Sequence, residues 1–87
     1  MNIFSVPKLL FMIAIFKTNV ESEYELHKLR KSFNSYIPQV KWDIDLFDCD
    51  RILRVDSTQD LNETIVKLFN KLGFNCTVLE VFHAPPM

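Results

Sequence analysis

Residues 40–56 read V-K-W-D-I-D-L-F-D-C-D-R-I-L-R-V-D, and this stretch decides the fold. Apolar and polar side chains alternate from Val40 to Leu46, and a shorter alternation follows Arg51. Successive side chains of a strand point to opposite faces of a sheet, so alternation indicates strands that are buried on one face. The polar residues between the two runs are typical of a turn. The stretch therefore predicts two antiparallel strands joined as a hairpin.

Chemical matching of facing residues predicts the register of this hairpin. If Cys49 and Asp50 form a two-residue loop, the four facing pairs given below are each apolar with apolar or acidic with basic. Cys-Asp is not a favoured two-residue turn, so a longer loop is the alternative. The expected pairs are Leu46 with Leu53 and Ile44 with Val55 on the inner face, and Asp45 with Arg54 and Phe47 with Ile52 on the outer face.

An amphipathic helix is expected before the hairpin, between Ser22 and Pro38. Ser22 and Glu25 match the S-x-x-E capping box, in which each side chain accepts a hydrogen bond from the backbone of the first turn. Proline interrupts a helix, so Pro38 marks its end. Apolar residues recur at helical spacing on one face: Leu26, Leu29, Phe33 and Ile37.

A second helix is expected after the hairpin. Asp60 with Glu63 repeats the capping pattern in a weaker form. Gly73 is the only glycine of the chain, and it stands where a left-handed residue commonly closes a helix. The apolar stripe consists of Leu61, Ile65, Leu68 and Leu72, with Phe69 beside it.

The two ends of the domain read as strands. Residues 11–17 are apolar at nearly every position, which is typical of a central strand, and residues 76–82 predict the last strand. The element order is then strand, helix, strand, strand, helix, strand. Two similar halves with one helix each predict an α+β ferredoxin-like βαββαβ sandwich. Its four-stranded antiparallel sheet has the order 4-1-3-2 and carries both helices on one face; a meander of the same elements is the alternative.

A chain of 87 residues holds a single domain. We place the ferredoxin-like domain at residues 12–82, between an N-terminal extension, 1–11, and a flexible tail, 83–87. The apolar run before Lys17 is far shorter than the roughly 20 residues of a membrane-spanning helix. No cleavage site for a signal peptide follows it. The expected location is therefore the cytoplasm, with no membrane contact.

Composition excludes several classes of function. The net charge is −1 with acidic and basic residues intermixed, so no basic field attracts nucleic acid. One glycine is too few for a glycine-rich phosphate loop. Neither a catalytic triad nor a nucleophile elbow is present. We expect a non-enzymatic domain without a cofactor.

The chain resembles the heavy-metal-associated domain of copper chaperones and copper-transporting ATPases over about residues 12–80. The residues that carry the resemblance are T-N-V-E-S at 18–22, the hairpin after W-D-I-D-L, D-L-N-E-T-I-V-K-L-F-N-K-L-G-F at 60–74, and G-F-N-C-T-V-L-E at 73–80.

The family holds copper(I) with the two thiolates of M-x-C-x-x-C at the junction of the first strand and first helix. In this chain Asn19 and Ser22 occupy the positions of those two cysteines. Copper(I) selects soft sulfur ligands, and amide or hydroxyl oxygen does not replace them. The resemblance therefore implies a divergent member without metal ligands.

Both cysteines of the chain have a structural interpretation. We expect Cys76 to be a small buried residue and Cys49 to lie in the hairpin turn, too far apart for a disulfide. The alternative is metal binding through unconventional ligands such as Cys49. Acidic residues at 43, 45, 48 and 50 invite a calcium reading, but the glycine and terminal glutamate of an EF-hand loop are absent.

A sheet with helices on one face leaves its other face to solvent or to a partner. We expect Phe47, Ile52, Leu79 and Val81 on that open face, if Cys76 and Val78 point toward the helices. Contiguous exposed apolar groups indicate association. The sequence thus predicts a protein partner or a homo-oligomer, and the alternative is that residues 1–11 cover the face.

Overall fold

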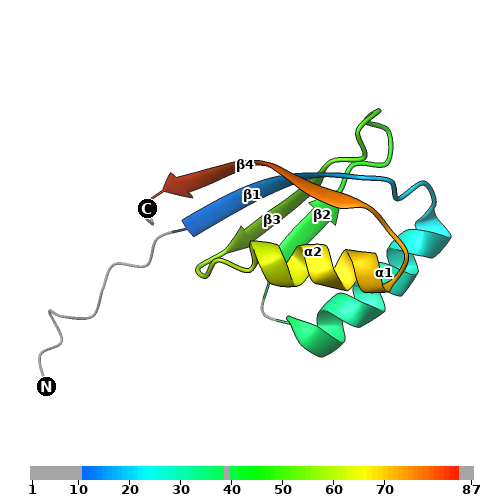
Figure 1. Ribbon diagram of the computed structural model, residues 1–87, viewed down its shortest axis with the longest axis horizontal. Helices are drawn as coiled ribbons and strands as arrows, with labels where there is room; N and C mark the ends of the chain where they lie inside the picture. The colour runs from blue at the N-terminus through cyan, green and yellow to red at the C-terminus, as the bar shows by residue number, and fades with distance from the viewer. Residues whose placement is uncertain (1–10, 39, 85–87) are drawn as a thin grey trace, which may run out of the picture.

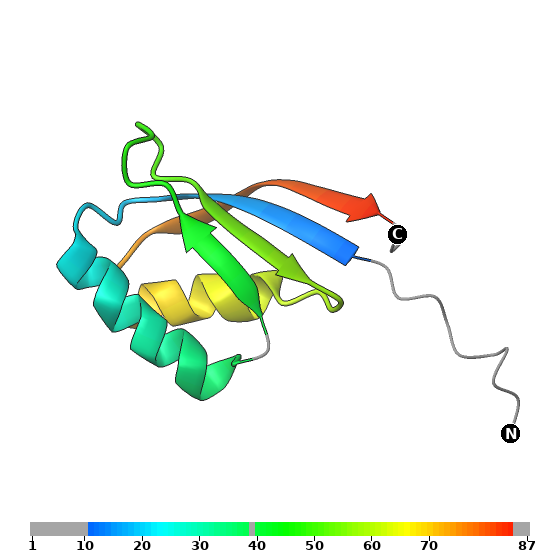
Figure 2. The ribbon, with the colours of Figure 1, turned by 180° about the vertical axis from the view of Figure 1, so that it is seen from behind.

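The computed structural model describes residues 11–38 and 40–84. Its elements are β1 (Phe11–Thr18), α1 (Glu23–Tyr36), β2 (Lys41–Ile44), β3 (Leu53–Ser57), α2 (Asn62–Lys71) and β4 (Cys76–Ala84). The strands form one antiparallel sheet in the order β2-β3-β1-β4, and both helices lie on the same face of it (Figures 1 and 2). The predicted ferredoxin-like sandwich is confirmed.

The sheet extends slightly beyond the expected domain. Phe11 pairs with Ala84 and Met12 pairs with His83, so the last two residues of β4 belong to the sheet and not to a tail. The rest of the expected extension and tail, residues 1–10 and 85–87, lies outside the described residues, as does Gln39.

Helix α1 begins at a capping box whose return bond is displaced by one residue. The Ser22 hydroxyl accepts the N–H of Glu25 at 3.2 Å, as expected of an N-cap. The Glu25 carboxylate accepts the N–H of Glu21 at 2.8 Å, instead of the N–H of Ser22. Beyond the helix, the N–H of Ile37 donates to the carbonyl of Phe33, and Pro38 follows.

Helix α2 begins without the expected capping box. Its N-cap residue is Leu61, which offers no polar side chain, and the Asp60 carboxylate accepts the N–H of Asn62 at 3.1 Å. The predicted capping box, with reciprocal hydrogen bonds between Asp60 and Glu63, is therefore wrong. The Asp60 carboxylate instead closes a local turn just before the helix.

The end of α2 follows the prediction for Gly73. This residue has a φ of +90°, and its N–H donates to the carbonyl of Asn70 at 3.1 Å. The N–H of Phe74 donates to the carbonyl of Phe69 at 2.9 Å. These two bonds form a Schellman motif, and Phe74 is buried against the helix that it closes.

The core lies between the sheet and the two helices. At its centre, the Phe33 ring lies 4.4 Å from the Trp42 ring and 5.9 Å from the Phe69 ring. The predicted helix stripes supply much of the core, although Leu61 and Leu72 are only partly buried. The fully enclosed side chains are Phe16, Val20, Leu29, Leu53, Ile65 and Phe69.

The hairpin register differs from the expected one by two residues. Ile44 pairs with Leu53, and Asp43 pairs with Arg54. A shift of two residues keeps each side chain on its predicted face, so the inner and outer assignments of these strands hold. The connecting loop, residues 45–52, is correspondingly longer than the expected turn at Cys49.

Internal hydrogen bonds explain why this loop is long. The Asp45 carboxylate accepts the N–H of Phe47 at 3.0 Å, and the Asp48 carboxylate accepts the N–H of Asp50 at 2.7 Å. Arg51 adopts a φ of 47° and its guanidinium donates to the backbone carbonyl of Leu46. Aspartate side chains that close local turns compete with the hydrogen bonds of a strand ladder. Here the turns form, and the ladder ends at the Ile44–Leu53 pair.

A β-bulge at Leu79 changes the side-chain alternation of β4. Phe16 pairs with Val78, but Ile15 pairs with Glu80, so Leu79 has no facing residue. Val81 is consequently opposite the buried Ala14 and packs against the core. The expected position of Val81 on the open face is wrong.

No helix of residues 11–38 and 40–84 is long and apolar enough to cross a membrane.

Candidate functional site

The open face of the sheet has an apolar half on β1 and β4. Ile13 pairs with Phe82, and the neighbouring Ile15 pairs with Glu80. Phe82 is 47% exposed and Leu79, in the bulge, is 52% exposed, whereas the two isoleucines are half-buried. We call Ile13, Ile15, Leu79 and Phe82 the apolar patch.

The other half of the open face is charged. Lys41 faces Asp56 and Asp43 faces Arg54 across β2 and β3. The Arg54 guanidinium donates to Asp56 at 2.9 Å, and this hydrogen bond raises the pKa of Arg54 above its ordinary value. Since Arg54 and Asp56 satisfy each other at an exposed site, this half offers little driving force for association.

The apolar patch borders the outer edge of β4, with which no strand of the described residues pairs. Strand β4 is at the edge of the sheet, opposite to the four-residue edge strand β2. Its C-terminal end extends past both helices in the two views (Figures 1 and 2). An exposed apolar edge strand offers unpaired backbone N–H and C=O groups to another strand.

The predicted interaction residues do not form one patch. Phe47 is fully exposed, but it lies in the β2–β3 loop and not on the sheet. Ile52 is half-buried where that loop enters β3, and Val81 faces the helices. Leu79 alone belongs to the apolar patch.

Phe82 was missed as an interaction residue because strict alternation along residues 76–82 places it on the helix side. A bulge reverses that alternation. No glycine marks this bulge, and the surrounding V-L-E-V-F gives no local signal of it.

A second candidate region lies where three loops meet at one end of the sheet. The Thr18 hydroxyl donates to the carbonyl of Arg51 at 2.7 Å, and the Thr18 N–H donates to the carbonyl of Asp50 at 3.1 Å. The side-chain oxygen of Asn19 accepts the N–H of Asn75 at 2.8 Å. The β1–α1 loop is thereby joined to the β2–β3 loop and to the α2–β4 loop.

The β1–α1 loop does not fit copper(I). Asn19 and Ser22 were expected, from the resemblance alone, at ligand positions. Their side-chain oxygens accept the backbone N–H groups of Asn75 and Glu25. Neither residue supplies sulfur, which copper(I) requires. These two side chains join the loops and cap α1.

The predicted positions of the two cysteines are confirmed. Both thiols are free; Cys49 is exposed in the β2–β3 loop, and Cys76 is buried. Burial raises the pKa of Cys76 to about 12 from a reference of 9.0. The Cys76 thiol therefore stays protonated near neutral pH, and this makes it a poor nucleophile and a poor metal ligand.

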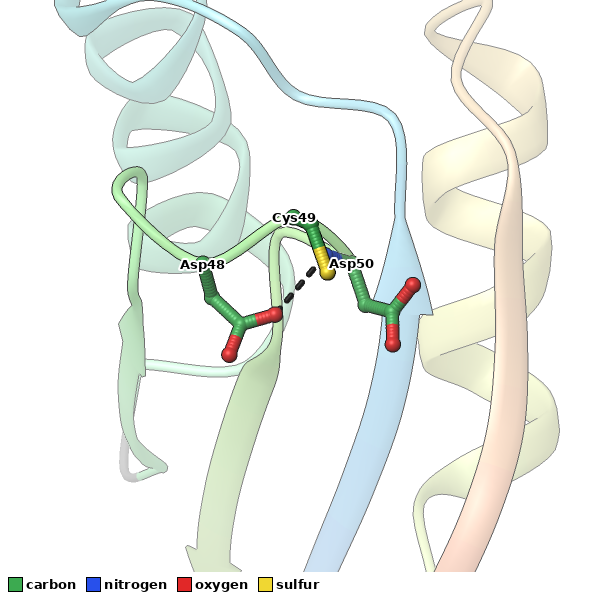
Figure 3. Close-up of side chains that lie close together, drawn as sticks. All are labelled: Asp48, Cys49 and Asp50. Atoms are coloured by element: carbon green, nitrogen blue, oxygen red, sulfur yellow. Dashed lines mark hydrogen bonds between the residues drawn. The ribbon is translucent and has the colours of Figure 1, made fainter.

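Cys49 lies between two carboxylates. The ligating atoms of Asp48, Cys49 and Asp50 lie within 4.8 Å of one another, and Figure 3 shows them grouped at the turn of the loop. The Asp48 carboxylate already accepts the N–H of Asp50, and the Asp50 carboxylate lies 3.6 Å from the ammonium of Lys17. Both carboxylates therefore have partners within the protein.

Compared with protein-family models, with curated proteins and with solved structures, the chain gives no significant match.

Proposed function

We propose that this chain is a small cytoplasmic binding domain, similar to heavy-metal-associated domains but without their metal ligands, that associates with protein through its apolar patch and the free edge of β4. The observation that carries the proposal is the exposure of Leu79 and Phe82 beside a strand edge that no described strand pairs with. Apolar groups in one patch along a free edge are typical of a contact surface.

The apolar patch supplies a driving force of suitable size for reversible association. An aromatic side chain contributes about 150–250 Å² of surface, so the exposed 47% of Phe82 is roughly 100 Å². At about 25 cal/mol per Å², burying that surface contributes roughly 2 kcal/mol. Leu79 adds a similar area. This supports a weak, concentration-dependent contact and not a permanent complex.

Sedimentation velocity of the full chain over a wide concentration range tests the proposal. We expect the average mass to rise with concentration, and we expect Phe82→Glu to return the chain to the monomer. Thr77→Glu is the matched control, because Thr77 is exposed on the same strand and pairs with Lys17, five positions before Phe82. A full chain that stays monomeric at every concentration and binds no protein probe through β4 contradicts the proposal.

A second candidate function is metal binding at Cys49, favoured by the close approach of its sulfur to the carboxylates of Asp48 and Asp50. One thiolate with two carboxylates suits zinc better than copper(I). Titration of the reduced chain with each ion decides between the candidates. Our first proposal expects no tight binding; one-to-one binding that is lost in Cys49→Ser replaces it with the second.

A further inference from the structure

We propose that the partner at β4 is a second copy of this chain, paired antiparallel along the free edges of the two β4 strands. This inference rests on the proposed function and specifies its partner. The pairing joins two four-stranded sheets into one continuous sheet, with all helices on the same face and both apolar patches on the other.

The geometry of an antiparallel edge favours a second copy as the partner. When identical strands pair antiparallel, a two-fold axis relates them, so the same edge serves both copies and the contact closes after two chains. Strand β4 is the longest in the sheet, at 9 residues, whereas the opposite edge strand β2 has 4. The long edge also carries the exposed apolar side chains.

Charge on β4 permits this pairing and selects its register. Glu80 is the only acidic residue of the strand, which has no lysine or arginine. A two-fold axis at Glu80 would place the two carboxylates directly opposite each other, and like charges in facing positions destabilise a strand pair. An axis at Val81 would separate them by only two residues along the strand.

A two-fold axis at Phe82 removes this repulsion. Glu80 then faces Ala84 of the second copy, and the two carboxylates lie about 13 Å apart along the strand direction, beyond the Debye length of about 8 Å at physiological salt. Phe82 faces its own counterpart, and aromatic pairs in facing positions stabilise antiparallel strands. The patch residue Ile13, which pairs with Phe82, extends the apolar contact within each copy.

The bulge at Leu79 limits the length of the pairing. An extra residue in an edge strand interrupts its ladder, so the regular segment available to a second copy is 80–84. Five residues on each side, with the exposed parts of Phe82 and Leu79, give an interface below the roughly 1,200 Å² of a standard stable complex. We therefore expect a dimer that dissociates on dilution.

Disulfide trapping tests the register in the full chain. The background is Cys49→Ser, because the exposed thiol would cross-link by itself, whereas the buried and protonated Cys76 stays unreactive. Facing residues of antiparallel strands have Cα atoms about 4.5–5.5 Å apart, within reach of a disulfide. Phe82→Cys should form a cross-linked dimer at least tenfold faster than the control Thr77→Cys.

A distance measurement retains the Phe82 side chain that drives association. Spin labels on Thr77→Cys in the same background should lie roughly 35 Å apart in the dimer, ten residues along the strand. A dimer that Phe82→Glu still dissociates, but with a different label distance and no cross-link at position 82, overturns this pairing and leaves the proposed function standing. A chain that remains monomeric yet binds another protein through β4 also overturns the second copy as partner and leaves the proposed function standing. A monomer without any contact at β4 overturns both.

Discussion

Asn19 illustrates how one side chain joins two distant segments of the chain. Its oxygen accepts the backbone N–H of Asn75, a residue 56 positions further along the chain. A hydrogen bond between such distant segments fixes the β1–α1 loop against the α2–β4 loop.

We expect Asn19→Ala to lower the free energy of unfolding by about 1 kcal/mol, because the loss of one hydrogen bond at an exposed site costs on the order of 0.5–1.5 kcal/mol. Urea denaturation of the two chains measures the difference. Asn75→Ala is the control: the donor at that position is a backbone N–H, so the bond survives the substitution. Equal stability of Asn19→Ala and the native chain would show that this bond contributes nothing.

The two thiols should differ sharply in reactivity. Cys49 is exposed, whereas burial raises the pKa of Cys76 to about 12. Only the thiolate is nucleophilic, so an alkylating reagent near neutral pH should modify one thiol quickly and the second only after unfolding. Mass spectrometry counts the adducts, and Cys49→Ser should give none in the folded state. Rapid double labelling of the folded chain would contradict the burial of Cys76.

The raised pKa of Cys76 also predicts a decline of stability at alkaline pH. Between the reference value of 9.0 and about 12, the folded chain retains a proton that the unfolded chain releases. Stability therefore falls as the pH rises through this window, and this contribution is intact below it. Cys76→Val should flatten that part of the pH profile in urea denaturation; an unchanged slope would assign it to other groups.

At the scale of elements, the sequence predicts what depends on local periodicity and misses what depends on one extra residue. The two helices and four strands were predicted in the right order, because each has its own pattern of apolar residues. The register of β2 with β3 was wrong, since the turns closed by Asp45 and Asp48 lengthen the loop. The bulge in β4 was missed for a similar reason: a single unpaired residue leaves no periodic trace, yet it decides which side chains reach the open face.

The end of α2 gives an element-scale prediction. Gly73 has a φ of +90°, and a Cβ added there would meet no atom within 4 Å. Gly73→Ala should therefore lose stability through backbone conformation alone, by roughly 1–2 kcal/mol. Gly73→Asn should lose less, because asparagine tolerates left-handed conformations. Equal losses in thermal unfolding of the two variants would point to a steric cause and against this account.

The whole molecule is asymmetric between its faces and between its edges. Helices cover one side of the sheet, and the apolar patch lies on the other side, on β1 and the longer edge strand β4. The loops with the exposed Cys49 lie at the opposite end of β1 from the Phe11–Ala84 pair. Association at β4 therefore leaves the end of the sheet where the three loops meet free in both copies.

Dimerisation should make thermal stability depend on chain concentration. Because only folded chains pair, mass action raises the melting temperature as concentration rises. We expect an increase of a few degrees between dilute and concentrated samples in differential scanning calorimetry. Phe82→Glu should remove this dependence while Thr77→Glu retains it. A melting temperature that is the same at all concentrations would contradict association.

The pairing of β1 with β4 has a consequence for folding during synthesis. Strand β1 is central in the sheet, and its neighbour β4 holds the last described residues. During translation, one side of this early apolar strand has no companion until residues 76–84 emerge from the ribosome. Until those residues are available, one edge of β1 stays unpaired and is open to chaperones or to transient collapse.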